Sequence, residues 1–121
     1  RVINLASNAG LTGYASSSAY CASKHAMIGM TRALAVEIAR SPVTVNSVCP
    51  GWVNTDMAWE GLSGWPGLTQ DEAWEIAKQE VPLRRMSEPA EIAGTVAWLL
   101  SDDTLGVTGQ AIDHNNGAFQ I

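Results

Sequence analysis

A strand–helix–strand pattern near the N-terminus constrains the fold more than any other feature of this sequence. Residues 2–6 form a short apolar run, and a segment rich in helix-forming residues extends from Ala19 to about Arg40. Residues 43–49 are rich in β-branched side chains, which favour a buried strand, and they end at Pro50. Parallel strands need a right-handed crossover connection of a dozen or more residues, so the pattern predicts an α/β fold.

The second half of the chain carries signals for two further helices and a last strand. Residues 69–72 form a capping box, which predicts a helix that Pro82 ends. Residues 87–89 are expected to start another helix, which continues through Leu100. Pro89 fits the first turn of this helix, where proline is tolerated. Residues 110–113 are expected to form a short strand.

Residues 52–68 differ in character from the segments around them. They combine tryptophan, methionine and leucine with several glycines and a proline. Aromatic-rich, mobile segments of this kind often cover ligands. A loop that is simply packed on the protein surface can have the same composition. Both interpretations stay open on the sequence alone.

Charge and cysteine content exclude several classes of function. The net charge is −5, so the chain lacks the basic footprint of a nucleic-acid-binding protein. No apolar run approaches the roughly 18 residues that a membrane span needs. Cys21 and Cys49 have no zinc-binding spacing and are expected to be buried thiols of a reducing compartment. We therefore expect a cytoplasmic protein with no metal, nucleic-acid or membrane partner.

Three segments with reactive side chains are expected to meet at one edge of the sheet. Tyr20 and Lys24 lie four residues apart at the start of the long helix, which places them on one helix face. Ser7 follows the first strand, and Pro50 and Gly51 follow the second. The carboxyl ends of parallel strands form the edge where ligands bind in such folds, so these residues predict a shared crevice. The alternative is a surface Tyr20 packed along the Lys24 stem.

The chemistry of these side chains predicts proton transfer at a carbon–oxygen centre. A nearby Lys24 ammonium is expected to stabilise the Tyr20 phenolate, so that Tyr20 exchanges a proton with a carbonyl or alcohol oxygen. Ser7 is expected to hydrogen-bond the same oxygen. The residues near Ser7 show no hydrolytic triad, so the sequence predicts that a cofactor supplies the difficult chemistry.

These segments resemble the classical short-chain dehydrogenase/reductase family. Ser7, the motif at residues 20–24 and the segment at residues 45–55 occur in the family's order and spacing, and residues 3–7 and 108–112 also fit. The most similar group is that of the 3-oxoacyl-(acyl-carrier-protein) reductases and polyketide ketoreductases. The resemblance implies the C-terminal half of a Rossmann-type, doubly wound parallel sheet with helices on both faces.

The resemblance also implies an activity and a site. It implies an NAD(P)-dependent oxidoreductase, with NADP or NAD as cofactor, that interconverts a carbonyl and a secondary alcohol by hydride transfer. Tyr20 is then the proton donor or acceptor and also contacts the substrate and the cofactor. Lys24 supports Tyr20 and hydrogen-bonds the nicotinamide ribose, and Ser7 orients the substrate oxygen. The residues expected to line the nicotinamide are Pro50, Gly51, Val53 and Thr55.

Partners and a substrate lid follow from the same resemblance. Residues 56–80 are expected to form a variable lid within a wider lid region at residues 52–86. The expected substrate is a small-molecule or acyl-thioester carbonyl compound. The long helix is expected to form part of an interface in a homodimer or homotetramer. Arg84 and Arg85 are interpreted as a solvated loop pair, with binding of a phosphorylated carrier as the alternative.

Several departures from the family pattern define what this chain is expected to lack. It has no glycine-rich phosphate loop, no cofactor-selecting residue and no upstream catalytic asparagine. Because Arg1 leads directly into an apolar strand, residues 1–121 are expected to be the C-terminal portion of one domain, inactive alone. Asn116 stands where the family often has glycine, and asparagine tolerates a left-handed backbone. A silent cofactor-binding or oligomerising relative, and an epimerase or dehydratase on this scaffold, remain alternatives.

Overall fold

A three-stranded parallel sheet forms the centre of the protein in this computed structural model, which describes residues 1–119. The strands are β1 (Val2–Leu5), β2 (Val45–Pro50) and β3 (Ala111–His114), in the order β1-β2-β3. Both pairs of neighbouring strands are parallel. The predicted α/β fold is confirmed, and each predicted strand is present to within two residues at either end.

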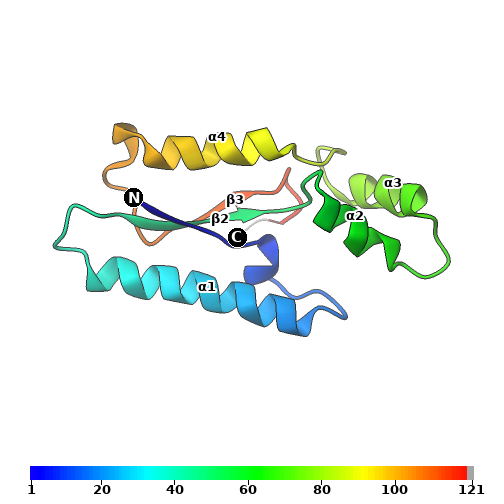
Figure 1. Cartoon of the computed structure of the whole chain (residues 1–121), viewed down its shortest axis with the longest axis horizontal. Coiled ribbons are helices and arrows are strands. Elements are labelled where there is room, and N and C mark those ends of the chain that lie inside the picture. The colour runs from blue at the N-terminus through cyan, green and yellow to red at the C-terminus, as the bar shows by residue number, and fades with distance from the viewer. Residues whose placement is uncertain (120–121) are drawn as a thin grey trace.

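Helices cover both faces of the sheet, as the resemblance implied. Helix α1 (Ser18–Glu37) connects β1 to β2 and lies on one face, while α4 (Pro89–Leu100) lies on the other (Figure 1). On the α1 side, the buried core consists of Ala6, Ile28 and Cys49. On the α4 side, it consists of Val48, Ile92 and Leu99. Burial of these apolar side chains against a twisted sheet is the main stabilising contribution in such layered folds.

The helix boundaries follow their local signals in most cases. Helix α3 (Gln70–Glu80) starts at the predicted capping box, in which Thr69 and Glu72 cap each other. Helix α4 begins at Pro89 as predicted. Ser17 precedes α1 at the capping position, but its side chain makes no capping hydrogen bond. Helix α1 also ends at Glu37 rather than near Arg40, because the chain tightens into turns after that residue.

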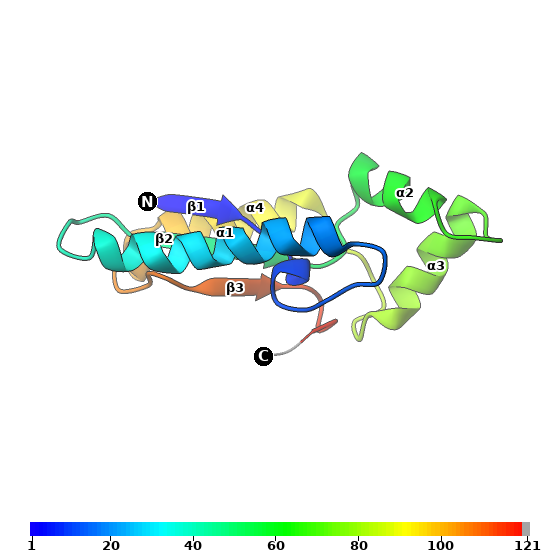
Figure 2. The same cartoon turned by 90° about the horizontal axis from the view of Figure 1, so that it is seen from below.

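The tryptophan-containing segment at residues 52–68 contains a helix that the sequence pattern does not predict. Helix α2 (Asp56–Ser63) begins after Thr55, whose hydroxyl accepts a hydrogen bond from the amide of Ala58. Trp59 of α2 stacks on Trp74 of α3, with ring centroids 3.9 Å apart and planes within 3°. Helix α2 is therefore packed on α3, and the two helices project together beyond the carboxyl ends of the strands (Figures 1 and 2).

Two short 3₁₀ turns complete the fold. They are η1 (Asn8–Gly10), which follows β1, and η2 (Asp102–Thr104), which follows α4. Among residues 1–119, no helix has the length and apolar character that a membrane crossing requires. The same residues bring together no group of three or more side chains that would hold a metal ion.

Candidate active site

Ser7 lies at the carboxyl end of β1, where the chain turns into η1. Its side chain is buried, and its Oγ accepts a hydrogen bond from the amide of Ala9 at 3.1 Å. The same hydroxyl donates to Oδ1 of Asn8 at 3.2 Å. Two local hydrogen bonds therefore hold the Ser7 oxygen at the edge of the sheet where a ligand is expected.

A close contact between η1 and α1 brings the Ser7 turn to the start of the long helix. A Cβ atom built on Gly10 would lie 2.7 Å from the carbonyl oxygen of Lys24 and 2.7 Å from Cδ1 of Ile28. Only glycine allows the two backbones to approach so closely. The turn that carries Ser7 therefore packs directly on the helical turns that follow Tyr20.

Tyr20 and Lys24 share one face of α1, as their spacing predicts. The Lys24 ammonium lies over the Tyr20 ring, with Nζ 5.6 Å from the ring centroid. The same Nζ donates a hydrogen bond to the carbonyl of Leu5, the last residue of β1, at 3.0 Å. The Tyr20 side chain is 45% exposed, so a ligand can reach it. The Lys24 ammonium therefore lies close both to the Tyr20 ring and to the end of β1.

The four residues predicted to line the nicotinamide follow one another at the end of β2. Gly51 lies against Asn115, since a Cβ there would come within 3.0 Å of the Asn115 Cα. Val53 forms an isolated parallel bridge with Ser87. The Thr55 hydroxyl lies 3.4 Å from the Ala58 amide, where it caps α2, and 3.4 Å from the Val53 carbonyl. Pro50, Gly51, Val53 and Thr55 thus lie where β2, β3 and α2 meet.

The turn after β3 has a left-handed backbone at two successive residues. Asn116 has φ +55° and Gly117 has φ +82°, which confirms that asparagine supports the left-handed conformation here. The Asn116 side chain donates to Oγ of Ser87 at 2.9 Å and to the carbonyl of Arg85 at 3.2 Å. This turn therefore joins the end of β3 to the segment that precedes α4.

Asn8 and Tyr14 belong to the same region, although the sequence does not single them out. Nδ2 of Asn8 donates a hydrogen bond to Oη of Tyr14 at 2.9 Å. Partial burial raises the pKa of Tyr14, and the nearby Cys21 and Glu80 raise it further. A raised pKa disfavours proton exchange near neutral pH, so Tyr14 is unsuited to the acid–base role predicted for Tyr20. Asn8 begins the short turn η1 and Tyr14 lies in the loop after it, and neither position shows a periodic signal.

Other polar residues near this edge have structural partners. Both cysteines are buried and free, as expected, and burial raises the pKa of the Cys49 thiol. Arg85 forms two hydrogen bonds of 2.7 Å with the carboxylate of Glu91. This pairing accounts for Arg85 without a bound phosphate. Arg84 is exposed and has a left-handed backbone with φ +53°.

The chemistry of the donor set fits one end of a dinucleotide cofactor. An exposed phenol, an ammonium and a buried hydroxyl lie at the carboxyl edge of a parallel sheet, where nicotinamide-type ligands bind in doubly wound folds. The sequence contains no glycine-rich loop of the kind that cradles a pyrophosphate. The residues present therefore fit the nicotinamide end and not the phosphate end.

Comparisons with known proteins agree with this geometry. A family model described as enoyl-(acyl carrier protein) reductase matches residues 1–118. The putative ketoacyl reductase 1 of the granaticin polyketide synthase from Streptomyces violaceoruber is 41% identical over 116 residues, which cover 93% of this chain and 43% of that protein. The chain spans about half the length of the curated relatives it matches.

Solved structures give the same result. Actinorhodin polyketide ketoreductase, crystallised with NADPH, superimposes with a TM-score of 0.92 and 40% identity, over 98% of this chain and 46% of that one. A short-chain dehydrogenase family protein from Francisella tularensis superimposes with a TM-score of 0.91 and 35% identity, over 96% of this chain and 49% of that one. The sequence motifs, the parallel sheet and these matches together show that the chain belongs to the short-chain dehydrogenase/reductase family.

Proposed function

We propose that this chain supplies the proton-transfer side of an NAD(P)-dependent oxidoreductase that interconverts a carbonyl compound and a secondary alcohol. The observation that carries the proposal is the Tyr20–Lys24 pair, held beside the Ser7 turn at the carboxyl edge of a parallel sheet. The ketoacyl reductase relative and the ketoreductase crystallised with NADPH support the same reaction class.

Each of the three side chains has a defined task in the reduction. The Ser7 hydroxyl donates a hydrogen bond to the carbonyl oxygen of the substrate and holds that oxygen near Tyr20. Tyr20 Oη gives its proton to the oxygen as negative charge develops there, and the oxygen becomes the alcohol hydroxyl. The Lys24 ammonium stabilises the phenolate that remains. In the oxidation, the same groups move the proton in the reverse direction.

When the cofactor, NADP or NAD, is bound, it supplies the hydride that reaches the substrate carbon. We assign its nicotinamide to the segment formed by Pro50, Gly51, Val53 and Thr55, and its ribose to Lys24. Support comes from the position of this segment at the end of β2, and from the NADPH that accompanies the actinorhodin ketoreductase structure.

The substrate belongs, in this proposal, to the 3-oxoacyl thioesters or polyketide carbonyl compounds, since the granaticin relative is named a ketoacyl reductase. The description of the family model names an enoyl reductase, which reduces a carbon–carbon double bond instead. We favour the carbonyl because Ser7 and Tyr20 offer two hydroxyls for one substrate oxygen. A catalytically silent relative would bind the dinucleotide without turnover. An epimerase or dehydratase on this scaffold would return the hydride to its substrate or would use no hydride.

The experiment that tests the proposal follows the hydride itself. The full-length protein is incubated with a neutral 3-oxoacyl thioester and with reduced cofactor that carries two deuterium atoms at nicotinamide C4. We expect one deuterium on the carbinol carbon of a 3-hydroxy product, which mass spectrometry detects. A 3-hydroxy product without deuterium on its carbinol carbon, or product reduced only at a carbon–carbon double bond, would contradict the proposal.

The remaining parts of the proposal concern the whole protein. We propose that residues 1–121 are the C-terminal portion of a single domain, that residues 52–86 are its substrate lid, and that the protein is a cytoplasmic homodimer or homotetramer. Exposed apolar side chains on α1, Met30 and Val36, support a role of this helix in a subunit interface. Sedimentation of the full-length protein as a monomer at micromolar concentration would contradict the oligomer.

A further inference from the structure

We propose that Asn8 and Tyr14 are positioning residues that orient the Ser7 hydroxyl for the reaction. The proposal rests on the proposed function, because Ser7 is the group through which both residues would act. Neither residue belongs to the predicted set of Ser7, Tyr20 and Lys24. The inference rests on a continuous chain of side-chain hydrogen bonds at the edge of the sheet.

The chain of hydrogen bonds runs from the loop after η1 to the Ser7 oxygen. Oη of Tyr14 accepts a hydrogen bond from Nδ2 of Asn8 at 2.9 Å. The other end of the same amide, Oδ1, accepts a hydrogen bond from the Ser7 hydroxyl at 3.2 Å. The amide of Ala9 donates to the Ser7 oxygen at 3.1 Å and fixes its position.

Tyr14 determines which end of the Asn8 amide faces Ser7. An asparagine side chain has a donor end and an acceptor end, and rotation by 180° exchanges them. Because Tyr14 Oη accepts from Nδ2, Oδ1 is directed toward Ser7. Asn8 is only 9% exposed, so few water molecules can take the place of Tyr14 as a partner. Without the phenol oxygen, nothing in the observed network keeps the amide in this orientation.

In this arrangement the Ser7 hydroxyl donates to an acceptor, Oδ1 of Asn8, that a substrate oxygen can replace. The Ser7–Asn8 distance of 3.2 Å is longer than the roughly 2.7–2.8 Å of a typical O–H···O hydrogen bond. The bond is therefore weak enough for the hydroxyl to exchange Oδ1 for the carbonyl oxygen of a bound substrate. With the amide reversed, Nδ2 would donate to Ser7 and the hydroxyl would lose its resting acceptor.

A double-mutant cycle in the full-length enzyme tests this coupling. Tyr14→Phe removes only Oη and keeps the ring, and we expect kcat for a 3-oxoacyl thioester to fall about three- to tenfold, in line with the loss of one hydrogen bond. The KM for the cofactor is expected to stay unchanged. In a Ser7→Ala background, Tyr14→Phe is expected to have no further effect, because no hydroxyl remains to be oriented. Thr12→Val, in the same loop, is the matched control and leaves kcat unchanged.

The outcomes separate this proposal from the proposed function. If the parent enzyme is active and Tyr20→Phe is not, the proposed function stands and the cycle decides the role of Tyr14. An unchanged kcat in Tyr14→Phe, or a loss that adds fully to that of Ser7→Ala, overturns the positioning role. Should Tyr14→Phe fail to fold, Asn8→Ser provides the same cycle. A parent enzyme without any turnover overturns both proposals.

Discussion

At the scale of single residues, the site depends on how closely the Ser7 turn approaches α1. Gly10 lies at the contact point, where any Cβ would meet the backbone of Lys24 and the side chain of Ile28 at 2.7 Å. Contacts below about 3 Å force the backbone to move, and movement here shifts Ser7 relative to Tyr20. Gly13 belongs to the same loop, yet a Cβ there would meet nothing within 4 Å.

This contrast predicts different effects for two glycine substitutions. Gly10→Ala is expected to destabilise the full-length protein by about 1–3 kcal/mol, the range for overpacked sites, and to lower kcat. Gly13→Ala is expected to change the free energy of unfolding by less than about 0.5 kcal/mol and to leave kcat unchanged. Denaturant unfolding and turnover assays measure both effects. Equal stability of the two variants would show that the close approach is absent.

At the scale of elements, an ion pair joins the start of α4 to the segment before it. Glu91 accepts two hydrogen bonds from Arg85 and a third from the amide of Glu88. These contacts lower the pKa of Glu91 to about 2, with the hydrogen bonds from Arg85 as the largest cause. A carboxylate with a lowered pKa stabilises the folded state above the pKa it has in the unfolded chain. The contribution is lost as the pH falls toward the pKa in the folded state.

The pH dependence of one variant checks this linkage. Glu91→Gln is expected to lower the melting temperature at pH 6–7, and the difference from the parent is expected to shrink between about pH 4.5 and pH 2. Glu37→Gln removes the same charge from the exposed surface of α1 and serves as the control. A difference that stays constant down to pH 2 would contradict the lowered pKa of Glu91.

The elements that follow a local rule are the ones the sequence predicts. The capping box at residues 69–72 and the proline of α4 fix helix starts by short-range hydrogen bonding, so both are visible in the sequence. Helix α2 is not predicted although Thr55 caps its start, because it is only eight residues long and its Trp59 stacks on Trp74, a contact between separate segments. Glycines within and after this helix further obscure its pattern.

The same distinction applies to the site. Tyr20 and Lys24 are predictable because four-residue spacing places side chains on one helix face, and Ser7 is predictable because it ends a strand. Asn8 and Tyr14 are not, since their hydrogen bond crosses an irregular loop that no periodicity describes. The strand and helix periods of the sequence thus locate the centre of the site but not the residues around it.

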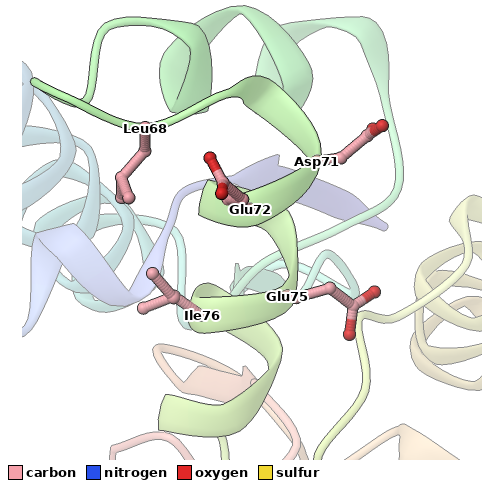
Figure 3. A pocket seen from close by; sticks show the side chains of 5 residues that line it. All are labelled: Leu68, Asp71, Glu72, Glu75 and Ile76. Carbon is pink, nitrogen blue, oxygen red and sulfur yellow. The ribbon is translucent and has the colours of Figure 1, made fainter.

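At the scale of the whole molecule, the negative charge is concentrated in one segment. Residues 56–80 contain six carboxylates and one lysine, a net charge of −5, which equals the net charge of the entire chain. Three of these carboxylates and two apolar side chains line an open groove of about 420 Å³ on α3, formed by Leu68, Asp71, Glu72, Glu75 and Ile76 (Figure 3). The remaining residues carry six positive and six negative side chains, so residues 56–80 alone are strongly anionic.

The negative charge of residues 56–80 predicts that the enzyme discriminates between thioesters by their charge. A coenzyme A thioester carries several phosphate charges, whereas an N-acetylcysteamine thioester of the same acyl group is neutral. Raising the ionic strength from 50 to 500 mM is expected to increase kcat/KM about two- to fivefold for the coenzyme A substrate and to leave the neutral one unchanged, because salt screens the repulsion. Steady-state kinetics of the full-length enzyme measure both dependences.

Charge-neutralising variants provide the control. Asp71→Asn combined with Glu75→Gln is expected to reduce the salt dependence for the coenzyme A thioester. Asp102→Asn combined with Asp103→Asn removes two charges at the other end of α4, away from α2 and α3 (Figure 1), and is expected to preserve the salt dependence. The same salt dependence for both thioesters would contradict an electrostatic role of residues 56–80.

The central claim is that Tyr20 transfers the proton in a nicotinamide-dependent reaction. Turnover of a 3-oxoacyl thioester by Tyr20→Phe in the full-length enzyme tests it most directly, with cofactor binding measured in parallel by fluorescence titration. Because a positioned acid or base contributes about 10²–10⁴-fold to the rate, we predict a loss of kcat of at least about 100-fold, with the cofactor Kd unchanged within about threefold. Turnover within about tenfold of the parent, with cofactor still bound, would contradict the assignment.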